Sequence, residues 1–578
     1  MIGYADVCGT YRKVIWLLTA LLGASHAASG QFANARNRFP GTGYRHYVAF
    51  DNSSLLSFAP PPRNPRTAIG STEERSAAAE KSAASKVRIL NGGEDLQTVL
   101  DSFAGTNVDV TIVLSPGYVY NKPLVLRNRP NNNWITVTSA HSFDPSVRVS
   151  PNDAANMPKL IASGSDPAVM TDQTLPPGAD HPGAGHHYRL IGLEITTTAP
   201  LNWNLVLLGT TKETTVADLP HDIYIGNSYI HGASSGEMVR GIMVDGGNIE
   251  IQSNYISGFK STFMEANAIG FFNCTSNFDI ENNYLEAAAE NLIVDGAGET
   301  ILNLVPQNIT IKHNYFYKPL EWRNLNPAVY VKNLLEFKNG NGIVVDSNIF
   351  ENNWAQNQNG TAVLFTVRTT GGQNPLNTVS GVHFTNNIVR HAAQGVVMAA
   401  YDDLSGLPVT SMVRSSDYTI DNNLFDDLSA NEYAPGAFAV CFQITGPPSN
   451  LKVSNNTCQY PAGELRQPLG LWLVGPTDLW GTTFTNNNFN TELGGDGRYG
   501  PDVLRVTPNT SDPQYPLDSQ LATPPAFAAN NVILEGNPVW QGQWQQTVPG
   551  ILFSAGSTSG ADVTSLLSME ANVKSGTY

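Results

Sequence analysis

The chain contains 578 residues and carries a formal net charge of −16. This acidity argues against nucleic acid as a partner, because phosphate binding needs a basic footprint on the protein. It also opposes an acidic polysaccharide at long range, unless bound cations or a local basic patch intervene.

The N-terminus contains a predicted targeting segment. Arg12 and Lys13 precede the apolar run Val14–Ala24, and small residues follow it. This run is too short to span a bilayer, and the layout is typical of a cleaved secretory signal peptide. We expect residues 1–27 to be removed, and the protein to be secreted or periplasmic without a membrane span.

Residues 28–85 are rich in Ala, Ser, Pro, Arg and Asn, which predicts a flexible lead-in. The next segment, GGEDLQTVLDSFAG, has apolar residues at Leu96, Val99, Leu100 and Phe103. This spacing predicts a short amphipathic helix over residues 93–104. The stretch VDVTIVLSPGYVY that follows reads as a strand and a turn.

A pattern recurs from Tyr188 onward: apolar, any, apolar, any, any, Asn, any, apolar. Its copies are YRLIGLEI, IYIGNSYI, IEIQSNYI, FDIENNYL, ITIKHNYF, IVVDSNIF, VHFTNNIV, YTIDNNLF, LKVSNNTC, TTFTNNNF and VILEGNPV. The sixth slot holds Asn254, Asn283, Asn314, Asn348, Asn387, Asn423, Asn456, Asn487 and Asn537. Most neighbouring slots lie 26 to 39 residues apart, and such a period indicates a solenoid.

The apolar residues within each copy alternate with a period of two, which predicts strands rather than helices. A second apolar strand, such as GIMVDG, NLIVDG or LLEFKN, precedes most copies. Parallel strands stacked coil on coil form a β-helix, in which the Asn side chains can bond along the stack as a ladder. An all-β sandwich is the alternative, but it leaves the fixed Asn slot unexplained. The helix over residues 93–104 suits a cap on the open end of the solenoid.

Several segments carry a more specific resemblance. The coil pattern, together with EANAI, NNYLEAAAENLIVDGA, VKNLLEFKN, FENNWAQNQNG and VLFTVR, resembles the pectin-lyase-like right-handed parallel β-helix superfamily. Within it, the chain is similar to bacterial secreted right-handed β-helix repeat proteins, a group without a well-defined activity. The resemblance implies a single-stranded, right-handed parallel β-helix of about ten or eleven coils over residues 86–540. Residues 541–578 are then a tail or a second cap, and a monomer is expected.

Cysteine usage and short motifs add little. Cys274, Cys441 and Cys458 are too few for a disulfide framework, so buried free thiols are expected. No CxxC or Cys/His cluster indicates zinc, and no GxSxG, Walker or HExxH motif is present. The pair His186 and His187 is read as a polar turn before a strand rather than as a ligand pair.

The superfamily resemblance implies that substrates lie along the first strand of each coil. Residues that alternate with the apolar ones should point outward there. These outward positions are Met243, Asp245, Gly270, Phe272, Ile293, Asp295, Glu336, Lys338, Leu364, Thr366 and Arg368. Because coils stack about 4.8 Å apart, Asp295, Lys338 and Arg368 should be neighbours on successive coils. Acidic and basic residues in register could bind a charged sugar, although surface ion pairs alone would explain them.

The loops beside this face supply further candidates. Aromatic rings next to polar side chains suit sugars, which have apolar faces and hydroxyl edges. The predicted substrate-binding residues are Lys318, Trp322, Arg323, Trp354, Gln358, Arg390 and His391. The competing interpretation of each Trp is that it packs its loop onto the solenoid.

The leading hypothesis is a polysaccharide lyase that acts on a uronate-containing glycan. Resemblance to pectate lyases implies acidic ligands that hold Ca²⁺, here Asp245 and Asp295. It also implies a Lys or Arg base, and Lys338 is favoured because the pKa of Arg368 is too high for ready deprotonation. Glu336 stands beside Lys338 as a third candidate catalytic residue. The WIDH segment and the second nearby Asp of the calcium-binding pattern are missing, which puts calcium in doubt.

Two other functions fit the same residues. A β-helix glycoside hydrolase needs paired carboxylates, and Asp295 with Glu336 or Glu286 with Glu290 could provide them. The NTD and DD signatures of polygalacturonases are absent, although Tyr401–Asp403 is a weak echo. A glycan-binding or surface protein without catalysis is the third hypothesis.

Overall fold

The computed structural model describes residues 85–162, 164–172, 184–210, 212–295, 299–402, 404–446, 448–461, 464, 468–474, 483–490, 504–507, 532–533 and 560–577. The chain divides into Met1–Ala79 and Glu80–Tyr578, and every described residue belongs to the second unit. The predicted signal peptide and almost all of the lead-in therefore lie outside the described residues. Within the described ranges, no helix is long and apolar enough to cross a membrane.

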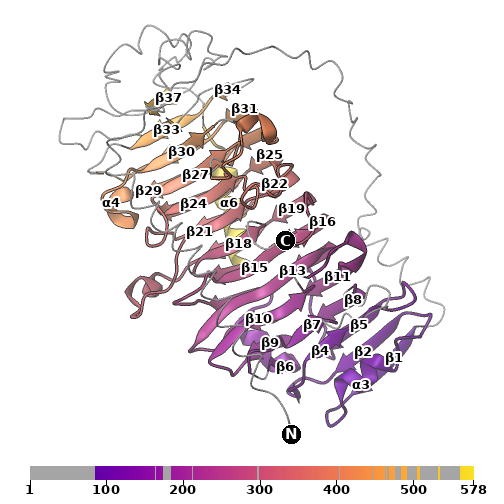
Figure 1. Cartoon of the computed structure of the whole chain (residues 1–578). Helices are drawn as coiled ribbons and strands as arrows, with labels where there is room; N and C mark the ends of the chain where they lie inside the picture. The colour runs from indigo at the N-terminus through magenta and orange to yellow at the C-terminus, as the bar shows by residue number, and fades with distance from the viewer. Residues whose placement is uncertain are drawn as a thin grey trace. The chain divides into compact units, whose positions relative to one another are not determined.

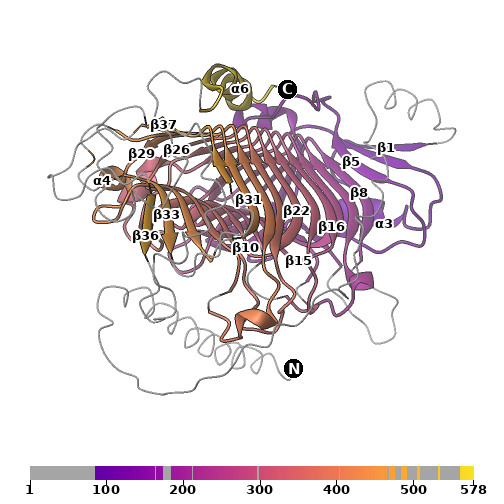
Figure 2. The ribbon, with the colours of Figure 1, turned by 90° about the horizontal axis from the view of Figure 1, so that it is seen from above.

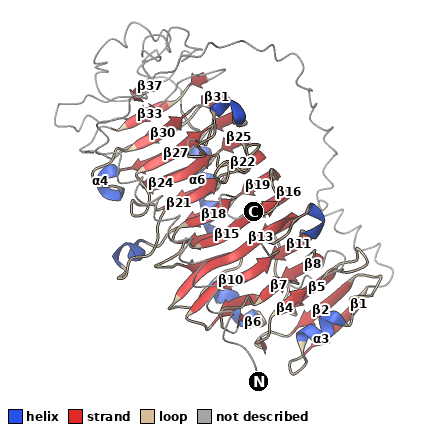
Figure 3. Ribbon diagram, in the orientation of Figure 1, coloured by secondary structure: helices blue, strands red, loops and turns tan. Residues whose placement is uncertain are grey.

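Three long parallel sheets build the second unit, and the chain visits them in turn as it winds (Figures 1 and 3). Sheet 1 contains β4 (Leu124–Leu126), β7 (Val169–Thr171), β10 (Leu201–Leu208), β13 (Glu237–Gln252), β15 (Asn267–Cys274), β18 (Glu290–Val294), β21 (Asn333–Phe337), β24 (Thr361–Thr366), β27 (Gln394–Ala399), β30 (Val440–Thr445), β33 (Leu469–Val474) and β36 (Leu504–Thr507).

Sheet 2 follows sheet 1 in each coil. It contains β1 (Lys86–Leu90), β2 (Val110–Leu114), β5 (Ile135–Ser139), β8 (His186–Ile191), β11 (His221–Gly226), the second half of β13, β16 (Ser276–Glu281), β19 (Gln307–Lys312), β22 (Gly340–Asp346), β25 (Val379–Thr385), β28 (Ser416–Asp421), β31 (Ser449–Ser454) and β34 (Thr483–Thr485). Seen from above, its strands stand side by side in sequence order (Figure 2).

Sheet 3 closes each coil. It contains β3 (Val119–Tyr120), β6 (Lys159–Ala162), β9 (Glu194–Thr197), β12 (Tyr229–His231), β14 (Tyr255–Phe259), β17 (Tyr284–Ala287), β20 (Tyr315–Tyr317), β23 (Ile349–Glu351), β26 (Ile388–Ala392), β29 (Leu424–Leu428), β32 (Thr457–Gln459), β35 (Asn488–Asn490) and β37 (Val532–Ile533). Short helices interrupt the loops: η2 (Pro151–Asn156), η3 (Val216–Asp218), η4 (Leu320–Asn324), η5 (Val409–Ser411) and α4 (Ala430–Tyr433).

The predicted fold, a right-handed parallel β-helix, is confirmed, because each strand pairs in parallel with the corresponding strand one coil away. The stack is longer than ten or eleven coils, since sheet 3 alone has 13 strands. The additional coils precede Tyr188, where β2 and β5 pair in register without an Asn in the turn. The repeat pattern could not reveal them, because it depended on that Asn.

Alternating apolar side chains fill the interior. Aromatic rings of successive coils stack there, and Phe316, Phe350 and Phe425 of sheet 3 form one column with Phe384 of sheet 2, with centroids 4.5, 5.8 and 6.5 Å apart in the order Phe316, Phe350, Phe384 and Phe425. All four side chains are fully buried and belong to one continuous core. Burial of this apolar surface, at about 25 cal/mol per Å², is the main stabilising contribution to the solenoid.

The Asn ladder lies in the turn between sheets 2 and 3. Each ladder side chain donates Nδ2–H to the Oδ1 of the next, as from Asn314 to Asn348 and from Asn348 to Asn387, both at 3.1 Å. Each Oδ1 also accepts the backbone N–H of the Asn one coil earlier. The ladder runs from Asn254 to Asn487, as the pattern predicts, and Asn537 lies outside the described residues.

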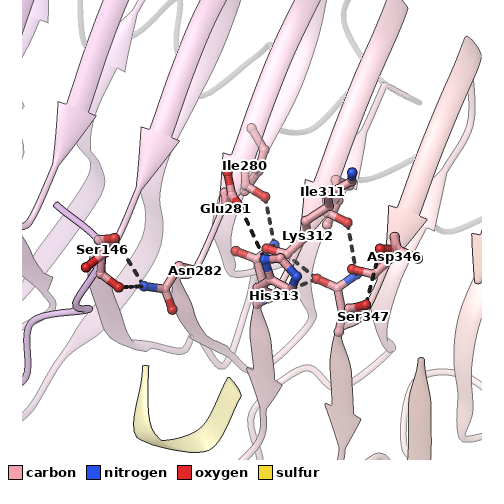
Figure 4. Close-up of polar contacts among 12 residues, drawn as sticks. Ser146, Ile280, Glu281, Asn282, Ile311, Lys312, His313, Asp346 and Ser347 are labelled. Carbon is pink, nitrogen blue, oxygen red and sulfur yellow. Dashed lines mark hydrogen bonds and ion pairs between the residues drawn. The ribbon is translucent and has the colours of Figure 1, made fainter. Parts of the chain in front are cut away.

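The residue before each ladder Asn takes a left-handed backbone conformation. Asn282, His313 and Ser347 have φ values of 55°, 56° and 57°. Figure 4 shows these three residues on consecutive coils, where Asn282 donates to Ser146 O and Ser347 donates to an Asp346 carboxylate oxygen. Asn tolerates this conformation better than most residues, which explains why Asn–Asn pairs recur along the chain.

The N-terminal cap is confirmed as helix α3 (Leu96–Asp101). Asp95 caps it by accepting the Thr98 N–H, and Leu96 and Leu100 enter the core. Gln97 pairs with both the N–H and the C=O of Val125, at 2.7 and 3.1 Å. Gln97 thus satisfies the backbone of β4 at the beginning of sheet 1, where no earlier strand pairs with it.

The C-terminal helix α6 (Val563–Ser575) lies along the side of the solenoid rather than across its open end. Leu566 packs against Ile388 and Leu424, and Lys574 pairs with Glu351 at 3.2 Å. Beyond the helix, Gly576 O accepts a hydrogen bond from Asn282, which lies several coils nearer the N-terminal end. A cap for residues 541–578 was one sequence-based expectation, and the helix instead spans successive coils beside sheet 3.

The cysteine prediction is wrong for two of the three thiols. Cys441 of β30 and Cys458 of β32 form a disulfide, whereas Cys274 is free and buried. The two partners project into the core from sheets 1 and 3. A count of cysteines cannot show that two opposite walls of the coil bring a pair together.

Removal of a ladder amide should destabilise the protein strongly. In Asn348→Ala the Asn314 N–H and the Ile311 C=O lose their buried partner, which costs about 1–3 kcal/mol for each unsatisfied group. We expect the midpoint of urea unfolding to fall, with Lys452→Ala, an exposed position on β31, as the control. Equal midpoints for the two variants would contradict a stabilising ladder.

Candidate functional site

The outward face of sheet 1 carries the predicted site. The strand pairing places Ile293, Glu336 and Leu364 in one row across three coils. In the next row, the Lys338 N–H donates to Val294 O and the Arg368 N–H donates to Lys338 O, both at 2.9 Å. Lys338 and Arg368, predicted as neighbours on successive coils, and Glu336, predicted beside Lys338, are therefore brought together. The third predicted neighbour, Asp295, is instead buried and accepts a hydrogen bond from the Asn339 amide.

Five charged side chains meet on this face, and we call Glu265, Glu290, Lys332, Glu336 and Lys338 the charged cluster. The ammonium of Lys332 lies 2.5 Å from Glu290, 3.0 Å from Glu265 and 3.7 Å from Glu336. Lys338 forms an ion pair with the other oxygen of Glu336 and contacts Thr366 at 3.4 Å. Two lysines thus alternate with three carboxylates across adjacent coils.

Amide side chains hold the carboxylates of the cluster in place. Asn267 donates to Glu290 at 2.9 Å, and Asn333 donates to Glu336 at 3.3 Å. Asn333 also donates to Gln358 at 3.1 Å, which draws the loop after β23 onto the cluster. Asn267, Glu290 and Asn333 are paired in register on β15, β18 and β21, so the parallel stack itself aligns them.

The cluster is mostly buried, but Glu265 is 46% exposed and both lysines reach the solvent. Glu290 and Glu336 are fully buried, whereas the Lys332 and Lys338 side chains are 12% and 13% exposed. Arg368 is 26% exposed and lies 3.4 Å from Asp402, a residue of the next coil. A ligand on the outward face of sheet 1 would therefore meet Glu265, Arg368 and the partly exposed ends of the two lysines.

The two fully buried glutamates of the cluster, Glu290 and Glu336, differ in pKa. Burial raises the pKa of Glu290 to about 7, although Lys332 acts in the opposite direction. Burial alone would also raise the pKa of Glu336, but Lys338 and Lys332 outweigh it and hold that pKa well below the usual range. Near neutral pH, of these two buried carboxyls, Glu336 is thus ionised and Glu290 is close to its titration point.

The two lysines of the cluster also have pKa values shifted in opposite directions. Burial lowers the pKa of Lys338, which Glu336 opposes and the positive charge of Arg368 reinforces. Burial acts on Lys332 too, but Glu290, Glu265 and Glu336 outweigh it and raise the pKa of that ammonium. Lys338 is therefore the lysine better suited to accept a proton, and Lys332 remains a fixed positive charge.

Lys318 does not face a substrate, so this prediction is wrong. Its side chain is fully buried, and its ammonium donates to the carbonyl oxygens of Ala287, Ala289 and Asn333 and to Oδ1 of Asn291. It fixes the backbone where three segments meet behind the cluster. The sequence motif YKPLEWR could not show this, because loop residues carry no inward or outward period.

Trp322 and Trp354 are also buried, at 6% and 4% exposure. They form a satellite apolar cluster with Val329, Val331 and Tyr433 that packs the loops onto the solenoid. The alternative interpretation of these rings, loop packing, is the one that the structure supports. Arg323 packs on this satellite cluster, because it lies over the Trp354 ring and pairs with Glu432 at 2.6 Å.

Arg390 and His391 lie on a different face from the cluster. Both belong to β26 of sheet 3. Arg390 pairs with Glu351 at 3.0 Å and with Glu570 of α6 at 2.5 Å, so it anchors the C-terminal helix. Gln358, by contrast, accepts a hydrogen bond from Asn333, the amide that also donates to Glu336.

Asp245 and Asp295 do not form a joint calcium site. Both are fully buried; Asp245 accepts the Asn273 N–H, and Asp295 accepts from the Asn339 amide, each at 2.8 Å. They belong to coils two apart, which separates them by about 10 Å at the usual strand spacing. A single Ca²⁺ needs six to eight oxygens at about 2.4 Å, so these residues do not fit it.

Glu286, proposed to pair with Glu290, lies elsewhere. It belongs to β17 of sheet 3, where it accepts the Tyr284 hydroxyl at 2.8 Å and the Gly258 N–H at 3.0 Å. Glu290 instead faces Glu336 across Lys332. The distances from Lys332 limit the separation of the two carboxylates to about 6 Å.

Several residues of this face escaped the sequence-based prediction. Lys332 was missed because it lies just before β21 and outside the alternating pattern. Arg240 was missed as well, although it stands in register with Asn267. Trp203 of β10, three coils from Glu290, and Phe263 of the loop before β15 form an exposed aromatic pair, with centroids 5.8 Å apart. One sequence signal could have revealed these polar residues. Three positions before the predicted outward row, the stacked coils carry Arg240, Asn267, Glu290 and Asn333 in register.

Comparisons with known proteins identify only distant structural neighbours. No family model matches the sequence, and no curated protein matches it. A mannuronic acid specific polysaccharide family 6 lyase from human gut microbiota is 9% identical, covering 85% of this chain and 98% of its own, with a TM-score of 0.40.

Two further neighbours are proteins of other kinds. DFA-IIIase from Arthrobacter chlorophenolicus A6 is 11% identical, covering 71% of this chain and 93% of its own, with a TM-score of 0.31. A tailspike protein of E. coli bacteriophage HK620 is 13% identical, covering 72% and 75%, with a TM-score of 0.32. Similarity at this level carries no argument about function, which must come from the site.

The raised pKa of Glu290 predicts a pH dependence of stability. A carboxyl whose pKa is higher in the folded chain favours folding below its ordinary pKa of 4.5, and this contribution is lost as the pH rises through about 7. We expect Glu290→Gln to lose less stability than the wild type between these two pH values. Urea unfolding across this range measures it, with Glu432→Gln, an exposed carboxylate, as the control. Parallel pH profiles for wild type and Glu290→Gln would exclude the assigned shift.

Proposed function

We propose that the protein is a carbohydrate-active enzyme of the polysaccharide lyase type, which cleaves a uronate-containing glycan by β-elimination on the outward face of sheet 1. The observation that carries this proposal is Lys338. Its ammonium is largely buried, its pKa is lowered by that burial, and it lies beside Glu336 and Arg368 at the solvent boundary.

β-Elimination removes the proton on the carbon α to the uronate carboxylate. In the proposed reaction that proton passes to the neutral amine of Lys338, and a carbon–carbon double bond forms as the glycosidic C–O bond on the neighbouring carbon breaks. The leaving oxygen takes up a proton from solvent or from the site. A base with a pKa near the working pH is the most effective one for the first step.

The substrate carboxylate must also be neutralised, because the transition state places further negative charge next to it. Lys332 and Lys338 flank β21 on one coil and Arg368 lies on the next, so Arg368 and Lys332 supply fixed positive charges near Lys338. Arg368 has the planar fork that binds carboxylates through two parallel hydrogen bonds. These cations also lie beside Glu336 and Asp402, so they offer local positive ends to a substrate carboxylate rather than a patch of net positive charge.

Calcium has no step in this reaction, because Asp245 and Asp295 do not fit the ion. The resemblance to pectate lyases still predicts a calcium requirement, and this prediction is separate from the assignment of Lys338 as the base. Activity measured with and without EDTA tests it independently of Lys338.

A glycoside hydrolase is the second candidate, and a specific observation favours it. Glu290, with its pKa raised to about 7, and Glu336, held ionised, are two carboxyl groups whose environments push their pKa values apart. Their separation, limited to about 6 Å, lies near the range that glycosidases use. Lys332 stands between them, and a hydrolase would have to bind its substrate around that side chain.

Substitution of the proposed base distinguishes these functions. Lys338→Arg keeps the ion pair with Glu336 but cannot lose its proton readily, so we expect lyase activity to fall at least about a thousandfold. Lys312→Ala on β19 is the matched control and should keep full activity. The assay follows the ultraviolet absorbance of the unsaturated product on a panel of uronate and neutral glycans.

Other outcomes of this assay are equally informative. Full activity of Lys338→Arg would overturn the assignment of the base. New reducing ends without the ultraviolet product, lost in Glu290→Gln, would establish the hydrolase instead. Glycan binding without either product would leave a non-catalytic binding protein.

The exposed aromatic pair predicts a glycan subsite beside the cluster, which depends on the proposed function. Trp203 and Phe263 are 36% and 46% exposed on the side of the cluster nearer the N-terminal end. Loss of a sugar–aromatic contact costs about 0.5–1.5 kcal/mol, so Trp203→Ala should raise KM about three- to tenfold and leave kcat nearly unchanged. Tyr118→Ala, another exposed aromatic, is the control. An unchanged KM on long chains would place the glycan elsewhere.

A further inference from the structure

A group of histidines lies at the beginning of sheet 2, outside the charged cluster. His186 and His187 begin β8, and His221 and Asp222 begin β11 on the next coil. The strand pairing sets His221 directly opposite His186, and their rings stack in parallel with centroids 4.8 Å apart. One potential ligand atom from each of His187, His221 and Asp222 lies within 4.8 Å of the other two.

We propose that His187, His221 and Asp222 bind a divalent transition-metal ion, with Zn²⁺ as the representative, and that His186 positions His187. The site is independent of the proposed reaction, because it belongs to a different sheet. It would join two successive coils through side chains from β8 and β11.

The hydrogen bonds around the histidines leave ring nitrogens free to bind a cation. Nε2 of His186 lies 3.0 Å from the carbonyl oxygen of Arg129, which can only accept, so this nitrogen carries the proton. Nδ1 of His186 then carries a lone pair and can only accept. Because it lies 2.8 Å from Nδ1 of His187, the His187 Nδ1 must carry a proton and donate it in this hydrogen bond. His187 therefore keeps an unprotonated Nε2, as a metal ligand requires.

His221 is oriented in a similar way. The Nδ1–H of His221 donates a hydrogen bond to the Asp222 carboxylate at 2.6 Å, so Nε2 of His221 carries the lone pair. A second carboxylate oxygen of Asp222 remains for a metal. Partners that fix the tautomer of a ligand histidine are the usual outer layer of protein metal sites.

The turn itself does not require these residues. His187 and Asp222 occupy a left-handed position, with φ values of 59° and 53°. The following coils fill the same position with Asn248, Asn277 and Asn308, which bond to one another at 2.7 and 3.1 Å. The position of His221 is filled by Gly247 on the next coil. Two adjacent coils thus replace a plain amide ladder with imidazole and carboxylate groups.

The donor set indicates the class of metal. Two imidazole nitrogens and one carboxylate oxygen suit Zn²⁺ and its first-row neighbours, whereas Ca²⁺ and Mg²⁺ take oxygen ligands. The side chains of His221 and Asp222 are 42% and 31% exposed, so solvent can supply a further ligand. Arg129 and Arg189 are the cations nearby, and both are engaged, with Arg129 on backbone carbonyls and Arg189 over the Trp134 ring.

The test is titration of the full-length, tag-free protein with ZnCl₂ in a calorimeter, alongside thermal unfolding with and without the ion. We expect one ion per chain, a rise in Tm with Zn²⁺ and no comparable rise with Ca²⁺ or Mg²⁺. Substitution with Co²⁺ should produce visible absorption that reports nitrogen ligation.

The neighbouring coils provide substitutions that preserve the turn. His187→Asn and Asp222→Asn copy the residues found at the same position on later coils, and each should weaken Zn²⁺ binding at least about tenfold. His313→Asn is the matched control, since it removes another histidine with positive φ whose neighbouring coil has Asn282 at that position. Folding of every variant is checked by its metal-free Tm.

Three results would overturn the proposal. They are stoichiometry well below one ion per chain, unchanged Zn²⁺ affinity in folded His187→Asn and Asp222→Asn, or an equal loss in His313→Asn. None of them bears on the lyase assay, so failure of the metal site and failure of the proposed function are distinguishable.

Discussion

The in-register stacking of parallel strands is the constraint on which the rest of the structure depends. Because each residue meets its counterpart one coil away, a single polar choice in a turn is repeated as a continuous ladder. The amides from Asn254 to Asn487 satisfy one another and the buried turn backbone at distances of 2.9–3.1 Å. The same register stacks Phe316 on Phe350 in the interior.

The stacking that stabilises the core also assembles the candidate site. Residues far apart in sequence become neighbours when their coils are adjacent, which is how Glu290, Lys332 and Lys338 come to lie on one face. Buried ion pairs contribute little net stability, because desolvation offsets their attraction. A cluster of this kind is therefore better explained by what it can bind or catalyse than by what it adds to folding.

Sequence reasoning succeeded where residues follow the repeat. The period predicted the sheets, the ladder and the adjacency of Lys338 and Arg368, with Glu336 beside Lys338, although Asp295, predicted in the same row, is buried. It failed for the loops, where Lys318 and Trp354 proved to be buried packing residues. Loops between coils differ in length and carry no alternation, so the direction of a side chain there depends on contacts from other coils. His186 and His187 were predicted to form a polar turn, because their own segment does not show that His221 lies beside them on the next coil.

The sequence by itself determined the coil, because local alternation and a recurring Asn report the backbone conformation of each residue. Only the tertiary structure decided which groups meet across coils and across the interior. It paired Cys441 with Cys458, set α6 along the flank, and brought Lys332 between Glu290 and Glu336. The physical reason is that these contacts join segments of unrelated pattern, whose relative positions follow from the packing of the whole stack.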